Sequence, residues 1–238
     1  MTKHHEAHDA PGVAAPTGAV ANLQIEQQQE VLLQAWACLY SPKSVLYVSG
    51  PMTTGRRFVD WYSSKGRSFR VNSRRYNAEL KKYVLDPNSK DIRAVAQRIR
   101  LARRRPVAEP TGLELSGWSQ SDYARLWVEF IQRFVDEMIM LPGWEYSVGS
   151  CREIATAFAA DVSVTTAEGE PISLPFAIRR LAIAVTELEK SNFISPTKDL
   201  RQEIDDVRQE LLMLQLALGP EEAVQQLRRL ARAIAQGW

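Results

Sequence analysis

The sequences VLYVSGP, at residues 45–51, and DEMIMLPGWEYSVGSCRE, at residues 136–153, decide the fold. Each contains a short run of apolar residues that leads into a turn with glycine and proline. A continuous apolar run of this length is typical of a strand that is buried on both faces, as in a parallel sheet. The two stretches therefore predict buried parallel strands at residues 45–49 and 138–141, each followed by a loop.

Helices and further strands alternate around these two runs. Apolar spacing predicts helices at residues 25–40, 55–64, 89–104 and 119–134, one that ends at 159 and one capped by Ser173, with short strands at 106–109 and 162–166. Such alternation favours an α/β fold, a flavodoxin- or Rossmann-like three-layer sandwich with a parallel sheet of about four to five strands. Ligands of such folds bind beyond the carboxyl ends of the strands, where both glycine-containing loops would lie.

Other segments surround this domain, which we place at residues 43–195. Residues 1–22 lack periodicity and are expected to be disordered, whereas residues 23–42 are expected to form a flanking helix. Residues 65–87 are expected to be an irregular basic insertion.

The C-terminal segment, residues 196–238, is expected to form a helical hairpin that is broken at Gly219-Pro220. Its apolar residues recur at alternating steps of four and three, the spacing of a coiled-coil seam: Leu200, Ile204, Val207, Leu211, Leu214 and Leu218. A narrow seam of this length favours burial against a second copy of the chain, and hence a homo-oligomer. Packing on the chain's own domain is the alternative.

Composition excludes several classes of protein. The 238 residues, 45% of them hydrophobic, can bury one substantial core. No apolar run approaches a membrane span or a signal peptide, so we expect a cytoplasmic protein with no membrane partner. Cys38 and Cys151 have no metal-ligand spacing, and all three histidines lie in the first ten residues. Catalysis by Ser-His-Asp or Cys-His groups is therefore not expected.

Positive charge is concentrated in the middle of the chain. Residues 56–105 hold 16 Lys or Arg against 4 Asp or Glu, although the whole chain has a net charge of only +2. Such a region attracts nucleotide phosphates or a nucleic-acid backbone, but without specificity. A nucleic-acid partner is therefore one alternative, and an ordinary solvated helix face is the other.

The second stretch also contains the elements of an anion site. Ser147 is placed to cap the helix that begins near residue 148, so Gly149 falls in its first turn and Glu153 in its second. Helix N-termini present unpaired N–H groups and positive potential, which suit a phosphate and help to keep Glu153 ionised. Ser147 is thus a candidate both for the cap and for a phosphate donor.

The two stretches resemble the nucleoside 2-deoxyribosyltransferase-like superfamily, in the branch whose pattern is GPMTG followed by D-x5-PGWE-x-S-x-G-x3-E. The resemblance covers roughly residues 45–190. It implies that the carboxylate of Glu153 attacks the anomeric carbon of a nucleoside or nucleotide, giving a glycosyl-enzyme ester that water or a second base resolves. It implies neither a metal nor an organic cofactor.

The first stretch is similar to the phosphate-binding loop of the nucleotide-cleaving, 5-hydroxymethyl-dUMP N-hydrolase-like branch of this superfamily. The matching positions are Tyr47, Gly50, Gly55 and Arg56. That branch has Ser where nucleoside transferases have Asp, six residues before the nucleophile, and this chain has Ser147 there. The resemblance therefore implies that 5′-monophosphates are preferred over nucleosides.

Two further roles are open. Several relatives carry an Asp that helps to handle the leaving base where this chain has Val128, so Asp122 or Glu129 is the candidate acid. Three aromatic residues are candidates either for stacking on a base or for packing in the core: Trp118, Trp144 and Tyr146.

The sequence therefore predicts an enzyme that cleaves the N-glycosidic bond of a nucleoside 5′-monophosphate or nucleoside, by hydrolysis or by base transfer. The alternatives are a catalytically idle nucleotide-binding sensor or oligomerisation module, and a nucleic-acid-binding protein. Glu153 distinguishes the enzyme from the sensor, because only the enzyme needs this carboxylate chemically.

Overall fold

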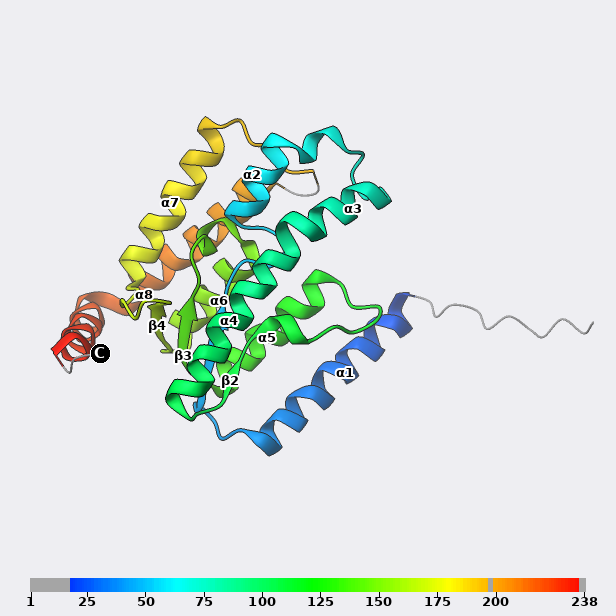
Figure 1. Cartoon of the computed structure of the whole chain (residues 1–238). Coiled ribbons are helices and arrows are strands. Elements are labelled where there is room, and N and C mark those ends of the chain that lie inside the picture. The colour runs from blue at the N-terminus through cyan, green and yellow to red at the C-terminus, as the bar shows by residue number, and fades with distance from the viewer. Residues whose placement is uncertain (1–17, 197–198, 236–238) are drawn as a thin grey trace, which may run out of the picture.

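A computed structural model describes residues 18–196 and 199–235 as one α/β domain (Figure 1). The strands are β1 (Val45–Ser49), β2 (Val107–Ala108), β3 (Val135–Met140) and β4 (Ser163–Thr166). The α-helices are α1 (Gly18–Leu39), α2 (Arg56–Ser64), α3 (Arg74–Leu80), α4 (Asp86–Arg103), α5 (Gln120–Phe134), α6 (Val148–Ala159), α7 (Leu174–Lys190) and α8 (Leu200–Ala235). Short helical turns lie at Gly66–Ser68, Pro110–Gly112 and Trp144–Tyr146, and a π-helix lies at Lys81–Leu85.

The four strands form one parallel sheet in the order β2-β1-β3-β4, with helices on both faces. This arrangement confirms the expected fold class, a Rossmann-like three-layer sandwich. The two strands predicted from apolar runs, β1 and β3, are the central pair, and Tyr47 lies beside Met138 in their register. Both loops that were expected at the carboxyl edge of the sheet therefore lie next to each other.

Strand β3 begins at Val135, three residues before the expected start. The first residues of β3 include Asp136 and Glu137. These two charged residues interrupt the apolar run from which the strand was predicted. Arginines at and just after the end of α4 pair with both carboxylates. Arg105 pairs with Asp136, and Arg103 pairs with Glu137. A buried charge in a strand is tolerated when it is paired in this way.

Alternation along β1 divides the core between the two faces of the sheet. Leu46 and Val48 face one side and pack with the apolar stripe of α4, which includes Ile92, Ala96 and Ile99. Val45 and Tyr47 face the other side, where the larger core is built from α5, α6, α7 and α8. Since successive residues of a strand point to opposite faces, Tyr47 and Ser49 lie on this second face together.

The C-terminal seam packs on its own domain, which was the alternative interpretation. Leu200, Ile204, Val207 and Leu211 are each at most 3% exposed and belong to the large core, and α8 packs against α6 and α7. The arrangement is consistent with the C-terminal helical hairpin expected within residues 196–238, although α8 is one helix over Leu200–Ala235. The apolar stripe that favoured burial against a second subunit is therefore buried within the chain itself. Self-association stays a prediction.

Helix α8 continues through Gly219 and Pro220, where a break was expected. A proline inside a helix removes one backbone hydrogen bond and favours a kink, but it does not have to end the helix. At the other end of the chain, α1 begins at Gly18, so residues 18–22 are helical rather than disordered. Residues 1–17, including the three histidines, lie outside the described residues.

The basic insertion at residues 65–87 is helical, not irregular. It contains α3, the π-helix and the start of α4, and it has an aromatic core of its own in which Phe58, Trp61 and Tyr62 of α2 pack with Tyr76 and Val84. Ser73 caps α3 by accepting a hydrogen bond from the N–H of Tyr76. The sequence hid this core because its aromatic residues are scattered among arginines and lysines without a helical period.

None of the described helices is both long enough and apolar enough to cross a bilayer.

The burial of the C-terminal seam generates a stability prediction. Ile204→Ala should lower the free energy of unfolding by about 2 to 5 kcal/mol, because it leaves a cavity in the large core. Met213→Ala is the matched control on the same helix, since Met213 is 66% exposed, and should change stability by less than about 0.5 kcal/mol. Chemical denaturation of the full chain measures both. Equal effects of the two changes would contradict the packing described.

Candidate active site

Two loops at the carboxyl edge of the sheet are joined by backbone hydrogen bonds. The N–H of Gly55, in the loop after β1, donates to the carbonyl of Tyr146, in the loop after β3, at 2.9 Å, and Leu141 N–H donates to Ser49 at 2.9 Å. Gly55 has a φ of 105°, and a Cβ atom there would lie 2.4 Å from Cβ of Pro51. Only glycine fits this position, so the predicted Gly55 fixes the shape of the loop.

Glu153 lies in the second turn of α6 and is held by the two polar side chains of β1 that face it. Tyr47 Oη donates to Glu153 Oε1 at 2.9 Å, and Ser49 Oγ donates to Oε2 at 2.5 Å. Because Tyr47 and Ser49 are two residues apart on one strand, they present their hydroxyls side by side. Each carboxylate oxygen therefore has its own donor.

Two opposing effects act on the ionisation of Glu153: burial disfavours the charged form, and hydrogen bonds favour it. Burial raises the pKa of Glu153 to about 7, although the hydrogen bonds from Ser49 and Tyr47 favour the ionised form. Burial, with the nearby Glu153 charge, also raises the pKa of Tyr47 well above 10, so Tyr47 stays a neutral donor. A carboxylate with a pKa near neutrality is typical of a catalytic group rather than of a surface ion.

Gly149 lies one helical turn before Glu153, near the N-terminal end of α6. Gly149 precedes Glu153 by four residues, which places both on one face of α6. Gly149 is exposed, and a Cβ atom there would meet nothing within 4 Å. The surface at Gly149 is therefore uncrowded.

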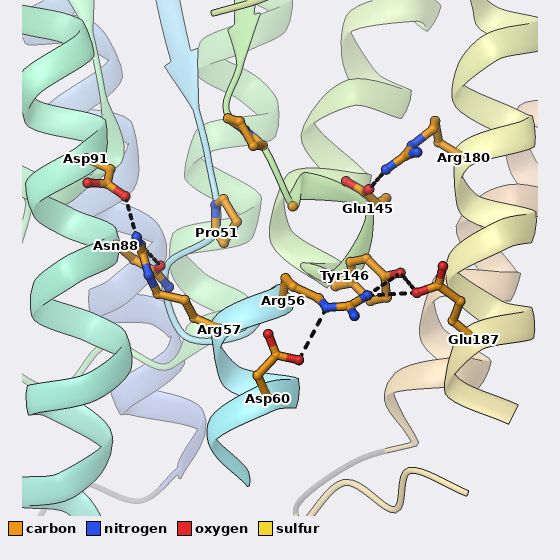
Figure 2. Close-up of a pocket in the computed structure, with 12 residues that line it drawn as sticks. Pro51, Arg56, Arg57, Asp60, Asn88, Asp91, Glu145, Tyr146, Arg180 and Glu187 are labelled. Atoms are coloured by element: carbon orange, nitrogen blue, oxygen red, sulfur yellow. Dashed lines mark hydrogen bonds and ion pairs between the residues drawn. The ribbon is translucent and has the colours of Figure 1, made fainter. Parts of the chain in front are cut away.

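A cavity of about 590 Å³ lies beside these loops, between α2, α4 and α7. Figure 2 shows Arg56, at the start of α2, pointing across to Tyr146 and to Glu187 of α7. Arg56 donates to Tyr146 Oη at 3.0 Å and to Glu187 Oε2 at 2.7 Å, and its Nε lies 3.3 Å from Asp60. Its guanidinium carbon is also 5.1 Å from the Tyr146 ring centre.

The Tyr146 hydroxyl completes this group by donating to Glu187. Burial and the Glu187 carboxylate raise the pKa of Tyr146 to about 12, so the phenol stays protonated at neutral pH. The hydrogen bonds from Tyr146 and Arg56 in turn lower the pKa of Glu187. Arg56, Tyr146 and Glu187 thus form one hydrogen-bonded cluster on the wall of the cavity.

Two further ion pairs line the same cavity (Figure 2). Arg57 contacts Asp91 at 2.8 Å and the Asn88 side-chain oxygen at 2.8 Å, while Asn88 donates to the Met52 carbonyl and so fixes the loop after β1. Arg180 of α7 pairs with the buried Glu145. Three arginines and four carboxylates therefore line the cavity, and each of these arginines is paired with a carboxylate.

No family model, curated protein or solved structure matches this chain. The resemblance to the deoxyribosyltransferase-like superfamily therefore stays a prediction.

The structure brings some predicted site residues together and separates others. Tyr47 and Glu153 are in direct contact, and Arg56 lines the cavity. Gly50 is tightly packed, since a Cβ atom there would lie 3.0 Å from Ile92 and 3.1 Å from Leu141, so its role is to let the strand end pack against α4. Glu153 itself does not line the cavity. Its hydrogen-bond donor Ser49 lies two residues before Pro51, and Pro51 does line the cavity.

Ser147 and Trp144 are buried. Ser147 is 3% exposed, caps α6 as predicted and accepts from the N–H of Ser150 at 3.4 Å, but it does not line the cavity beside Arg56. Trp144 is 5% exposed and packs in the large core, which is the alternative to stacking on a base. Trp118 packs at a tilt against Tyr123 and donates to Gln28, whereas Tyr146 lines the cavity.

The two candidate acids both have structural partners on α5. Asp122 forms a capping box with Ser119, and this hydrogen bonding, together with Arg125, lowers its pKa. Glu129 pairs with Arg133 one turn along the helix. Neither lines the cavity, and the lowered pKa of Asp122 is the opposite of what a general acid needs.

Several residues of the cavity could not be recognised from the sequence. Asp91 and Asn88 come from α4, and Arg180 and Glu187 come from α7, so these four side chains converge only in the folded chain. In the sequence each lies on the polar face of a helix, where a charged residue is ordinary. Among the described residues, no group of three or more His, Cys, Asp or Glu side chains is arranged to hold a metal ion.

The contacts of Glu153 generate a prediction on its ionisation. Tyr47→Phe removes one donor to the carboxylate and keeps the buried ring, so the pKa of Glu153 should rise above about 7 by roughly 0.5 to 1. Carbon-13 NMR of the glutamate side-chain carboxyls measures this titration, with Glu153→Gln identifying the resonance. Tyr76→Phe is the matched control, because Tyr76 is also buried but has no hydrogen bond to Glu153. An unchanged pKa in Tyr47→Phe would refute the donor role.

Proposed function

We propose that this protein cleaves the N-glycosidic bond of a nucleoside 5′-monophosphate or nucleoside, with Glu153 as the nucleophile. The observation that carries the proposal is the Glu153 carboxylate: it is held by Tyr47 and Ser49 at the carboxyl edge of the sheet, near a cavity lined by both arginines and carboxylates. Parallel α/β sheets bind their ligands at this edge. The resemblance of residues 45–57 and 136–153 to deoxyribosyltransferase-like proteins supports the same reaction.

The proposed reaction has two steps. A carboxylate oxygen of Glu153 forms a bond to the anomeric carbon while the bond from that carbon to the base breaks; the base leaves with that electron pair and takes up a proton from the solvent. Water or a second base then attacks the same carbon, breaks the ester bond and loses a proton to the solvent. Water gives the free sugar and a second base gives a new nucleoside or nucleotide, and both restore the carboxylate. Tyr47 and Ser49 hold the carboxylate in position for the attack.

The pKa of Glu153 sets the expected pH dependence. A nucleophilic carboxylate must be ionised, so the rate at low substrate concentration should rise with pH through about 7. The same raised pKa makes the stability of the fold change with pH in the direction opposite to the rate. Because the unfolded carboxyl ionises near 4.5 and the folded one near 7, Glu153 lowers the stability of the fold as pH rises across this range.

The first test of the proposal is the substitution Glu153→Gln. The amide keeps the size of the carboxyl group but cannot form the ester, so base release should fall by several orders of magnitude. Chromatographic detection of free base from a panel of nucleosides and nucleoside monophosphates measures it. Glu168→Gln, the same change at an exposed turn, is the control and should leave turnover as it is. Turnover that persists in Glu153→Gln would exclude Glu153 as the nucleophile.

A phosphate-binding role for Arg56 follows from its place in the cavity. Arg56 is 53% exposed and its partner Glu187 is 48% exposed, and ion pairs at such exposure contribute only about 0 to 1 kcal/mol. A 5′-phosphate can therefore displace Glu187 at little cost and accept charge-assisted hydrogen bonds from the guanidinium.

Arg56→Ala should accordingly lower kcat/KM for nucleoside monophosphates by roughly 10- to 100-fold and should change that for the matching nucleosides little. Steady-state kinetics on matched nucleoside and nucleotide pairs measure this, with Arg98→Ala, an exposed arginine outside the cavity, as control. Equal values for a nucleoside and its nucleotide on the unmutated protein would reject the phosphate site.

A further inference from the structure

A dense positive surface lies on the helical insertion between α2 and α4. We define this basic patch by its seven exposed cations: Lys65, Arg67, Arg70, Arg74, Arg75, Lys81 and Lys82. Glu79 is the one acidic residue between positions 65 and 85. Figure 1 shows α3 at one corner of the molecule, beyond the end of α2.

The basic patch differs from the rest of the protein in how its charges are paired. In the described part of the chain, ten arginines outside the patch form ion pairs with carboxylates. Within the patch only Lys65 does so, with Glu79. Arg70, Arg74 and Lys81 have no ion-pair partner among the described residues. The patch therefore concentrates uncompensated positive charge, which a polyanion would neutralise.

An exposed aromatic ring lies among these cations. Tyr83 is 41% exposed, and the ammonium groups of Lys65 and Lys82 lie 4.6 and 5.0 Å from its ring centre. Arg75 similarly lies 5.1 Å from the ring centre of Phe69, which is partly buried. An exposed ring flanked by cations can stack on an unpaired base while the cations contact the adjacent phosphates.

The insertion has a rigid base for this surface. Phe58, Trp61 and Tyr62 of α2 pack with Tyr76 and Val84 beneath the patch, in a core separate from the two that hold the sheet. Between residues 65 and 85, Tyr83 is the one large apolar or aromatic side chain that is well exposed. A membrane-surface helix would instead present several exposed apolar residues. The pattern therefore fits a nucleic acid better than a lipid surface.

We propose that the basic patch binds single-stranded nucleic acid, through phosphate contacts of its lysines and arginines and stacking of a base on Tyr83. This surface is separate from the Glu153 site, and the proposal does not depend on the chemistry proposed there. Binding should fall steeply with salt, because neutralised phosphates release their counterions. For about five phosphate contacts, the logarithm of the association constant should fall with the logarithm of salt concentration with a slope of about −3.5.

The test is fluorescence anisotropy of a labelled 20-nucleotide single strand of mixed sequence, titrated with the full chain at several salt concentrations. The triple variant R70Q/R74Q/K81Q should lose about 10- to 100-fold in affinity at low salt, and its salt slope should be less steep by about 2. The matched control R98Q/R133Q/R179Q removes three exposed cations elsewhere and changes the net charge equally, so it should bind almost as well as the unmutated protein. Equal losses in the two triple variants would overturn the proposal.

Tyr83→Ala separates single-strand binding from simple charge attraction. It should weaken single-strand binding about 5- to 100-fold without changing the salt slope, and it should affect a duplex of the same sequence less. Unchanged single-strand binding in Tyr83→Ala, or tighter binding to the duplex or to phosphatidylserine vesicles than to the single strand, would also overturn it. Glu153→Gln should bind the strand normally, so failure of the glycosidase proposal leaves this result unaffected.

Discussion

The hydrogen bonds of Glu153 to β1 join parts of the chain that are 104 and 106 residues apart. They connect the end of the central strand to the beginning of α6, and therefore the two loops that form the carboxyl edge of the sheet. A half-buried carboxylate is costly to ionise unless donors surround it, and Tyr47 and Ser49 supply one donor to each oxygen. This contact therefore ties the end of β1 to the second turn of α6.

The cavity beside this contact has an unusual balance of charge. Its arginines come from α2 and α7, and its carboxylates come from α2, α4, α7 and the loop after β3. Its four carboxylates outnumber its three arginines, so an anionic ligand must exchange with a carboxylate rather than fill a site of bare positive charge. Selectivity in such a cavity comes from the difference between the incoming group and the carboxylate that it replaces.

The sequence predicted the fold better than the site. Apolar runs identified β1 and β3 because a buried strand must be apolar on both faces, and Ser147 and Ser173 identified helix starts because a cap needs a side-chain acceptor. Tyr47 and Glu153 came from the resemblance, and their mutual contact is a fact of the structure. Asp91, Arg180 and Glu187 could not have been found from spacing, because their convergence depends on how α4 and α7 cross the sheet.

The errors have physical reasons of the same kind. The seam of α8 follows the pattern of a coiled coil, but a helix that covers two others in one domain needs a similar apolar stripe, and local spacing does not distinguish the two. The insertion was expected to be irregular because its apolar residues follow no simple period. In the structure they form a small core with α2. These contacts join residues too far apart in the sequence to be recognised in a short sequence window.

The place of α8 in the core has a consequence for synthesis on the ribosome. Leu200, Ile204, Val207 and Leu211 fill the core between α6 and α7, and these residues are among the last of the domain to be made. A growing chain folds from its N-terminus as it emerges, so the sheet and its first helices exist for a time with an apolar face uncovered. Closure of the domain is therefore a late event, after residue 211 has left the exit tunnel. Until then the nascent chain depends on its surroundings to keep that face from associating with other chains.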